Sequence, residues 1–151
     1  MLYFAGFGPG MDELREHARS EGVQSQVKLL GRVRHDRLPV LYSASDLVFV
    51  PYAFERLNEG SVTFEAFACG RPVAGWKRFE NTPAEQDGGF LLDLDPLAGG
   101  EQLASRLADS AYIERKSNEG RTLGEQVSLE AAGAKLDAAY QKSVGHGARV
   151  L

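Results

Sequence analysis

Residues Asn58–Val73, Asn-Glu-Gly-Ser-Val-Thr-Phe-Glu-Ala-Phe-Ala-Cys-Gly-Arg-Pro-Val, decide the fold, because they predict a loop, a short helix and a buried strand in succession. Ser61 is a suitable N-cap, since its hydroxyl can accept a hydrogen bond from an amide one turn later. Gly70 suits the position just after the helix, and Pro72 prevents the helix from continuing. The residues between these signals are mostly apolar, so we expect the helix to pack against a sheet.

A single carboxylate, Glu65, lies within this apolar helix, about one turn after its start. The amides of Gly60, Ser61 and Val62 would point out of the helix start, where the helix dipole favours phosphate. Together they suggest a nucleotide site in which Glu65 accepts hydrogen bonds from ribose hydroxyls and the amides bind the diphosphate. The alternative is a solvated glutamate or a partner for an arginine, and the apolar neighbours argue against a solvated face.

The composition excludes several classes of protein. The chain has 151 residues, of which 43% are apolar and 25% charged, with a net charge of −4 and no basic block, which argues against a nucleic-acid partner. No apolar run reaches transmembrane length, and we expect no signal peptide. Cys69 is the single cysteine, which rules out an internal disulfide and fits a cytoplasmic location. The histidines are scattered, so we expect no metal site.

Short apolar runs alternate with helical segments as far as about residue 92. We expect buried strands at Leu2–Ala5, Val27–Leu30, Asp46–Val50, Pro72–Ala74 and Phe90–Leu92. We expect helices at Met11–Glu21, after the potential cap Asp36, from Ser61, and at about Glu101–Asp109, Ala111–Asn118 and Gly124–Lys142.

This alternation predicts an α/β fold with a doubly wound, mainly parallel sheet and a ligand crevice at the carboxyl ends of its strands. We expect one Rossmann-like domain over residues 1–142, with residues 143–151 as a frayed tail. The helical C-terminal third is expected to pack back onto the domain.

The glycine-rich turn Gly6-Phe7-Gly8-Pro9-Gly10 allows a dinucleotide-binding interpretation, but the third glycine of that fingerprint is missing. The next strand ends at Gly31, where such a fold needs an acid for the ribose, so a nicotinamide site is disfavoured. A tight strand-to-helix turn is the better interpretation, and close approach of the Gly6 and Gly8 backbone to a ligand is the functional alternative.

The turn around Arg32–Arg37 allows two interpretations. It is either a solvated loop or a platform for a nucleotide base, held by the backbone of Val33 with Arg34 near the phosphates.

Four segments of this chain resemble the C-terminal, nucleotide-sugar-binding half of a GT-B glycosyltransferase of family 4. The resemblance extends to about residue 95, and its most specific part is Phe64–Val73. The other matching segments are Phe4–Leu14, Val27–Val33 and Leu38–Asp46.

The resemblance implies retaining transfer of a sugar from a nucleotide-diphosphate donor, without a metal or other cofactor. Glu65 matches the family's ribose-binding glutamate, and Gly60–Val62 would hold the diphosphate. The family's first glutamate lies eight positions earlier, where this chain has Leu57. Glu59 and Glu55, six and ten positions before Glu65, are therefore the candidates for the catalytic, sugar-contacting role.

A complete member of that family also has an N-terminal domain that binds the acceptor, and a further strand in the middle of this sheet. The resemblance therefore implies a truncated enzyme, inactive alone, or a chain that needs an N-terminal-domain partner or a full-length transferase. A sheet without that strand is expected to be unstable or differently paired. The alternatives are a catalytically silent interaction module and an unrelated nucleotide-binding α/β domain.

Overall fold

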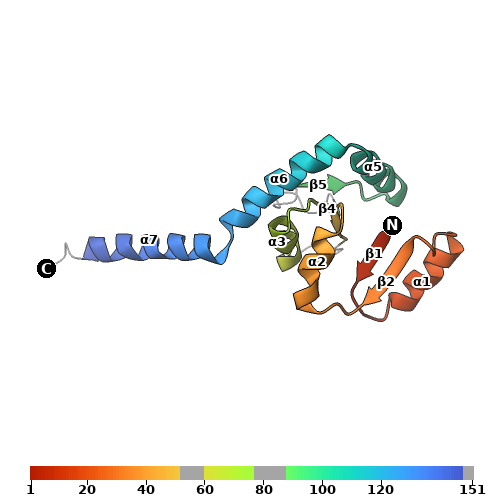
Figure 1. Cartoon of the computed structure of the whole chain (residues 1–151), viewed down its shortest axis with the longest axis horizontal. Coiled ribbons are helices and arrows are strands. Elements are labelled where there is room, and N and C mark those ends of the chain that lie inside the picture. The colour runs from red at the N-terminus through yellow and green to blue at the C-terminus, as the bar shows by residue number, and fades with distance from the viewer. Residues whose placement is uncertain (52–59, 77–87, 148–151) are drawn as a thin grey trace. The chain divides into compact units, whose positions relative to one another are not determined.

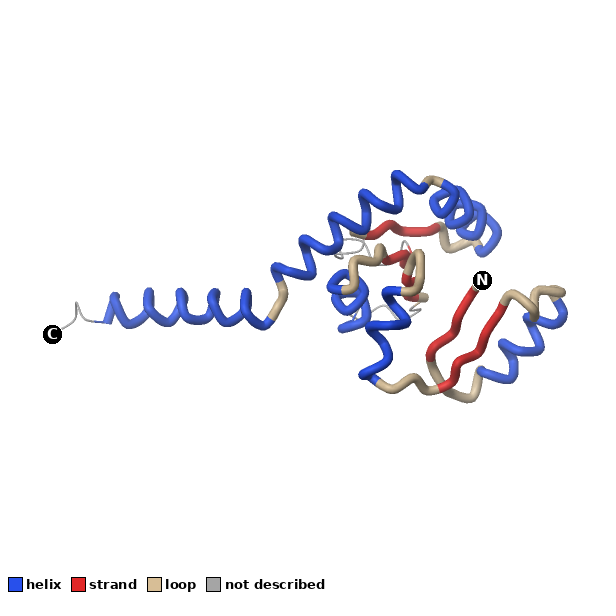
Figure 2. Tube along the Cα trace, in the orientation of Figure 1, coloured by secondary structure: helices blue, strands red, loops and turns tan. Residues whose placement is uncertain are grey.

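The structure, a computed structural model, describes residues 1–51, 60–76 and 88–147. It divides the chain into two compact units, Met1–Val40 and Leu41–Leu151. Each unit combines parallel strands with helices (Figure 2), which confirms the predicted α/β class.

The first unit is a strand–helix–strand element followed by a short turn (Figure 1). Strand β1 (Leu2–Ala5) pairs in parallel with β2 (Val27–Gly31), and Leu2 lies opposite Val27. The intervening helix α1 (Met11–Ser20) packs against β2 and buries Ala18. A single 3-10 turn, His35–Arg37, follows.

The expectation that β1 and β2 are buried is wrong. Leu2 is 45% exposed, Tyr3 52% and Leu30 41%. A parallel strand is buried only when elements cover both faces of its sheet. Only one α-helix, α1, lies entirely within residues 1–40, and it packs against β2.

The second unit contains a three-stranded parallel sheet in the order β3-β4-β5. The strands of this sheet are β3 (Val48–Val50), β4 (Val73–Trp76) and β5 (Gly89–Leu92). Helix α2 (Leu38–Ser43) precedes β3 and spans the boundary between the units, and helix α3 (Gly60–Ala68) follows β3. The described strands pair as a two-stranded sheet, β1-β2, and a three-stranded sheet, β3-β4-β5.

Strand β4 is covered on both faces. Val73 packs with Val50 and with Ala66 and Phe67 of α3, whereas the next residue, Ala74, packs with Phe90 and with residues of the C-terminal helices. Successive side chains of a strand point to opposite faces, so these two clusters lie on opposite sides of the sheet. The predicted packing of the apolar helix α3 on a sheet is confirmed.

Three helices complete the second unit: α5 (Pro96–Ala108), α6 (Ser110–Gln126) and α7 (Leu129–Gly147). Helix α5 begins five residues earlier than predicted, because Asp95 caps it by accepting a hydrogen bond from the amide of Ala98. Helix α6 continues through the region where a break was predicted. Its glycines, Gly120 and Gly124, pack against α3.

The C-terminal helices do not all pack back onto the domain. Helix α5 contacts β5, and α6 contacts both α3 and β5, as expected. The side chains of residues 132–144 in α7 are all exposed. Helix α7 also continues through Ser143 to Gly147, where the sequence suggested a frayed tail.

Candidate functional site

The first backbone amides of α3 have no acceptor within the helix. The helix begins at Gly60, so Ser61 lies in the first turn, and its predicted role as N-cap is wrong. Gly60, Ser61 and Val62 therefore contribute amides of the first turn, which have no intrahelical acceptor. This is the geometry that binds anions at a helix start.

Glu65 lies one turn further along α3 and is half-buried. It follows Ser61 by four residues and Val62 by three, so it shares a face of the helix with them. Helical side chains lean toward the helix N-terminus, so the Glu65 side chain extends toward the first turn of α3. Its neighbours Ala66 and Phe67 are fully buried and anchor this part of α3 in the core.

The Glu65 carboxylate has a partner that residue spacing does not predict. The hydroxyl of Tyr42 on α2 donates a hydrogen bond to Oε2 of Glu65 over 3.0 Å. The two residues are 23 positions apart, so no local spacing links them. The structure buries Tyr42 to 9% exposure, and a buried tyrosine commonly finds a partner for its hydroxyl.

The turn after α3 ties the same two helices together a second time. The amide of Gly70 donates to the carbonyl of Phe67 and the amide of Arg71 to that of Ala66, with Gly70 at a φ of +67°. This Schellman geometry confirms the predicted C′ role of Gly70. Arg71 then donates from its guanidinium to the carbonyl of Ser43 at the end of α2, over 2.6 Å.

In the first unit, the two predicted turns lie side by side. The amide of Gly6 donates to the carbonyl of Gly31 over 2.9 Å, so the Gly6 turn and the turn that leads to Val33 are adjacent. The guanidinium carbon of Arg32 lies 4.8 Å from the centre of the exposed Phe7 ring. Both turns follow the carboxyl ends of parallel strands, where ligands bind in folds of this kind.

Arg34, predicted to lie near the phosphates, is paired with a neighbouring carboxylate. Its guanidinium donates two hydrogen bonds to the Asp36 carboxylate, over 3.0 and 2.9 Å. Both side chains are exposed, so this pair is exchangeable with a phosphate ligand at little cost. Gly8 is exposed, and a side chain added there would meet nothing within 4 Å.

The two candidate catalytic acids, Glu55 and Glu59, lie outside the described residues, and so does Leu57. Within residues 1–51, 60–76 and 88–147, no group of three or more His, Cys, Asp or Glu side chains is placed to hold a metal ion. The helices of the described part include none that is long and apolar enough to cross a membrane.

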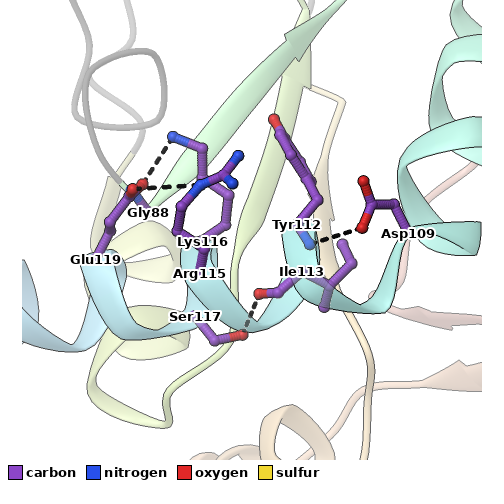
Figure 3. Close-up of polar contacts among 8 residues, drawn as sticks. All are labelled: Gly88, Asp109, Tyr112, Ile113, Arg115, Lys116, Ser117 and Glu119. Carbon is purple, nitrogen blue, oxygen red and sulfur yellow. Dashed lines mark hydrogen bonds and ion pairs between the residues drawn. The ribbon is translucent and has the colours of Figure 1, made fainter.

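One further carboxylate, Glu119 on α6, lies in a polar cluster at the start of β5 (Figure 3). It accepts a hydrogen bond from the Lys116 ammonium over 2.8 Å and one from the amide of Gly88 over 3.4 Å. The bond from Lys116, followed by that from Gly88 and the charges of Lys116 and Arg115, lowers the pKa of Glu119 despite partial desolvation. This cluster joins α6 to the residue that precedes β5, which is a structural role.

The fold of this chain recurs in solved structures of GT-B glycosyltransferases. A sucrose-phosphate synthase from Thermosynechococcus elongatus matches 96% of this chain and 38% of its own, with a TM-score of 0.72 and 23% identity. Anabaena HepE, in complex with UDP and glucose, matches 94% of this chain and 40% of its own, with a TM-score of 0.68 and 20% identity. The C-terminal domain of a group 1 glycosyltransferase, LpcC from Francisella tularensis, covers 80% of this chain and 65% of its own, with a TM-score of 0.61 and 21% identity.

The sequence places the chain in a family. Residues 1–109 match the family described as glycosyl transferases group 1. A D-inositol 3-phosphate glycosyltransferase from Salinispora arenicola is 38% identical over 109 residues, which represent 68% of this chain and 24% of that enzyme. The chain belongs to the glycosyl transferases group 1 family, and it spans about a quarter of the length of that relative.

Proposed function

We propose that this chain forms the donor-binding portion of a glycosyltransferase, which binds a nucleotide-diphosphate sugar and transfers the sugar with retention when the rest of the enzyme is present. Glu65 would accept the ribose hydroxyls, and the amides of Gly60–Val62 would bind the diphosphate. Transfer would proceed without a metal or other cofactor, with Glu59 or Glu55 contacting the sugar.

The observation that carries this proposal is the arrangement of α3. A half-buried carboxylate, Glu65, lies about one turn from the first-turn amides Gly60–Val62 and shares a helix face with Ser61 and Val62. Adjacent ribose and diphosphate groups of one nucleotide match such a pair of sites, because the first offers hydroxyl donors and the second negative charge. Membership of the group 1 family and the complex of HepE with UDP and glucose support this assignment.

We expect the chain alone to be inactive, because the reaction requires an acceptor-binding part in addition to the donor site. In support, the aligned region of the Salinispora relative is 24% of that enzyme. An N-terminal-domain partner chain or a full-length transferase would supply the remaining groups.

The test is a thermal-shift titration of this chain with UDP, GDP and ADP, each with and without EDTA. We expect one nucleotide to raise the melting temperature and EDTA to leave the shift unchanged. Glu65→Ala should weaken binding about 5- to 150-fold, because loss of the hydrogen bonds to a partly buried carboxylate costs about 1–3 kcal/mol. The variant Glu65→Gln removes the charge but keeps the size of the side chain and an oxygen that can accept from Tyr42. Comparing it with Glu65→Ala therefore separates the loss of charge from the loss of packing.

The matched control is Glu101→Ala, which removes an exposed carboxylate from α5 of the same unit. It should bind nucleotide as the unaltered chain does. A cooperative melt that none of the three nucleotides shifts would contradict the proposal. That outcome would favour a catalytically silent interaction module, which the Leu57 departure from the family's glutamate spacing also favours.

A further inference from the structure

The hydroxyl of Tyr42 makes its hydrogen bond to the carboxylate that the proposed function assigns to the ribose. We propose that Tyr42 is a positioning residue, which orients the Glu65 carboxylate toward the ribose hydroxyls of the donor; this inference rests on the proposed function. The bond joins the Tyr42 hydroxyl to Oε2 of Glu65 over 3.0 Å, between helices α2 and α3.

The geometry leaves the carboxylate able to accept from a ligand. An ionised carboxylate has about four acceptor positions on its two oxygens. Tyr42 occupies one position on Oε2, and within the described part of the chain Oε1 has no hydrogen-bond partner. A ribose with free 2′ and 3′ hydroxyls brings two donors, so the carboxylate can accept hydrogen bonds from Tyr42 and from the ligand at the same time.

Tyr42 is itself held firmly, which a positioning residue requires. Its side chain is 9% exposed. Its carbonyl accepts hydrogen bonds from the hydroxyl of Ser45 over 2.8 Å and from the Ser45 amide over 3.0 Å. The next carbonyl, that of Ser43, accepts from Arg71 over 2.6 Å. The end of α2 is thus fixed to the turn after α3.

A glutamate side chain without such a partner would sample several rotamers, and binding would have to restrict them. Ordering a rotamer-rich side chain on binding lowers affinity, and a preorganised side chain avoids that loss. The Tyr42 hydroxyl restricts the Glu65 carboxylate before the nucleotide arrives. The alternative is that the hydrogen bond only joins α2 to α3 and has no effect on the ligand.

The variant Tyr42→Phe separates these roles, because it removes one oxygen and keeps the ring. The probes are the nucleoside diphosphate that stabilises the unaltered chain and its 2′,3′-dideoxy analogue, with both affinities measured by calorimetry. If Tyr42 positions Glu65 for the ribose, the preference for the ribose form should fall about 3- to 10-fold in Tyr42→Phe, as expected for one hydrogen bond. A role confined to helix packing would change both affinities by the same factor.

The control is Tyr112→Phe, a change in a tyrosine that is also 9% exposed and whose ring packs edge-on against Phe90. It should leave the ribose preference unaltered. In a Glu65→Gln background, adding Tyr42→Phe should change that preference little, since the two residues act through one contact.

An unchanged ribose preference in Tyr42→Phe, or a variant that no longer melts cooperatively, would overturn the positioning role and leave the proposed function intact. Failure of the unaltered chain to bind UDP, GDP or ADP would overturn both. The two failures are therefore distinguishable.

Discussion

The two compact units contain similar secondary structure but differ in how they bury it. Of the residues in Met1–Val40, Ala18 is the one buried hydrophobic residue, whereas Leu41–Leu151 contains two clusters of buried residues on opposite faces of one sheet. The apolar runs of β1 and β4 look alike in the sequence. Burial therefore depends on whether helices cover both faces of the strand, which a run of apolar residues does not specify.

The largest expected difference between the units comes from Phe67→Ala in α3. Phe67 is completely buried, so its truncation should lower the free energy of unfolding by about 3–5 kcal/mol. Leu2→Ala in β1 should cost about 1 kcal/mol, because Leu2 is already 45% exposed. Urea titration monitored by fluorescence of Trp76, the single tryptophan and a residue of β4, reports on the second unit.

Hydrogen exchange at the Gly6 amide, which is bonded to Gly31, reports on the first unit for Leu2→Ala. Equal costs for the two truncations would show that β1 is covered in solution and would remove the contrast between the units.

Gly120→Ala tests the close packing of the second unit. A Cβ at Gly120 would lie 2.6 Å from Cδ1 of Phe67, so the helices α3 and α6 must separate. We expect a loss of about 1–3 kcal/mol, as is typical when a packed core is overfilled. The measurement is the midpoint of urea denaturation.

The matched control is Gly133→Ala in α7, where an added Cβ meets nothing within 4 Å. That change should stabilise the helix by up to about 1 kcal/mol, because alanine is the better helix former. A neutral Gly120→Ala would indicate that the contact between α3 and α6 yields easily.

The smallest effect is expected for Glu119→Gln. The pKa of Glu119 is lowered below its ordinary value of 4.5 in the folded protein, chiefly by the hydrogen bond from Lys116. A lowered folded pKa means that the ionised form stabilises the fold above the unfolded pKa and that this contribution is lost as the pH falls through the folded value.

Glu119→Gln should therefore destabilise the chain by about 0.5 kcal/mol at pH 7, as for a partly exposed ion pair. The difference from the unaltered chain should disappear as the pH falls below 4.5, the ordinary value. Urea titrations at a series of pH values measure it, with Glu125→Gln, an exposed residue of the same helix, as control. A deficit that persists at low pH would assign the effect to packing.

Local signals predicted the class and the order of elements, because they depend on neighbours in the chain. The Gly70-Arg71-Pro72 sequence located the end of α3, and the alternation of apolar runs and helices located all five described strands. The predicted break between Asn118 and Gly124 was wrong, because α6 is continuous there and packs Gly120 and Gly124 against Phe67 and Ala68. That contact joins segments distant in sequence and has no local signature.

In the candidate site, residue spacing relates only the residues that belong to one helix. Glu65 and the amides of Gly60–Val62 belong to one helix, and the sequence alone placed them together. Tyr42 reaches Glu65 from another helix, and Arg34 is engaged by Asp36, so neither relation followed from residue spacing.

Helix α6 carries its two glycines four residues apart on the side that meets α3. Each glycine costs the isolated helix about 1 kcal/mol relative to alanine, and the close contact with α3 offsets that cost. A Cβ at Gly124 would lie 2.9 Å from the Ala68 amide nitrogen, a backbone atom that no substitution on α3 can shrink. Among descendants of this sequence, position 124 should stay glycine, whereas position 120 is free to vary together with the size of the side chain at position 67.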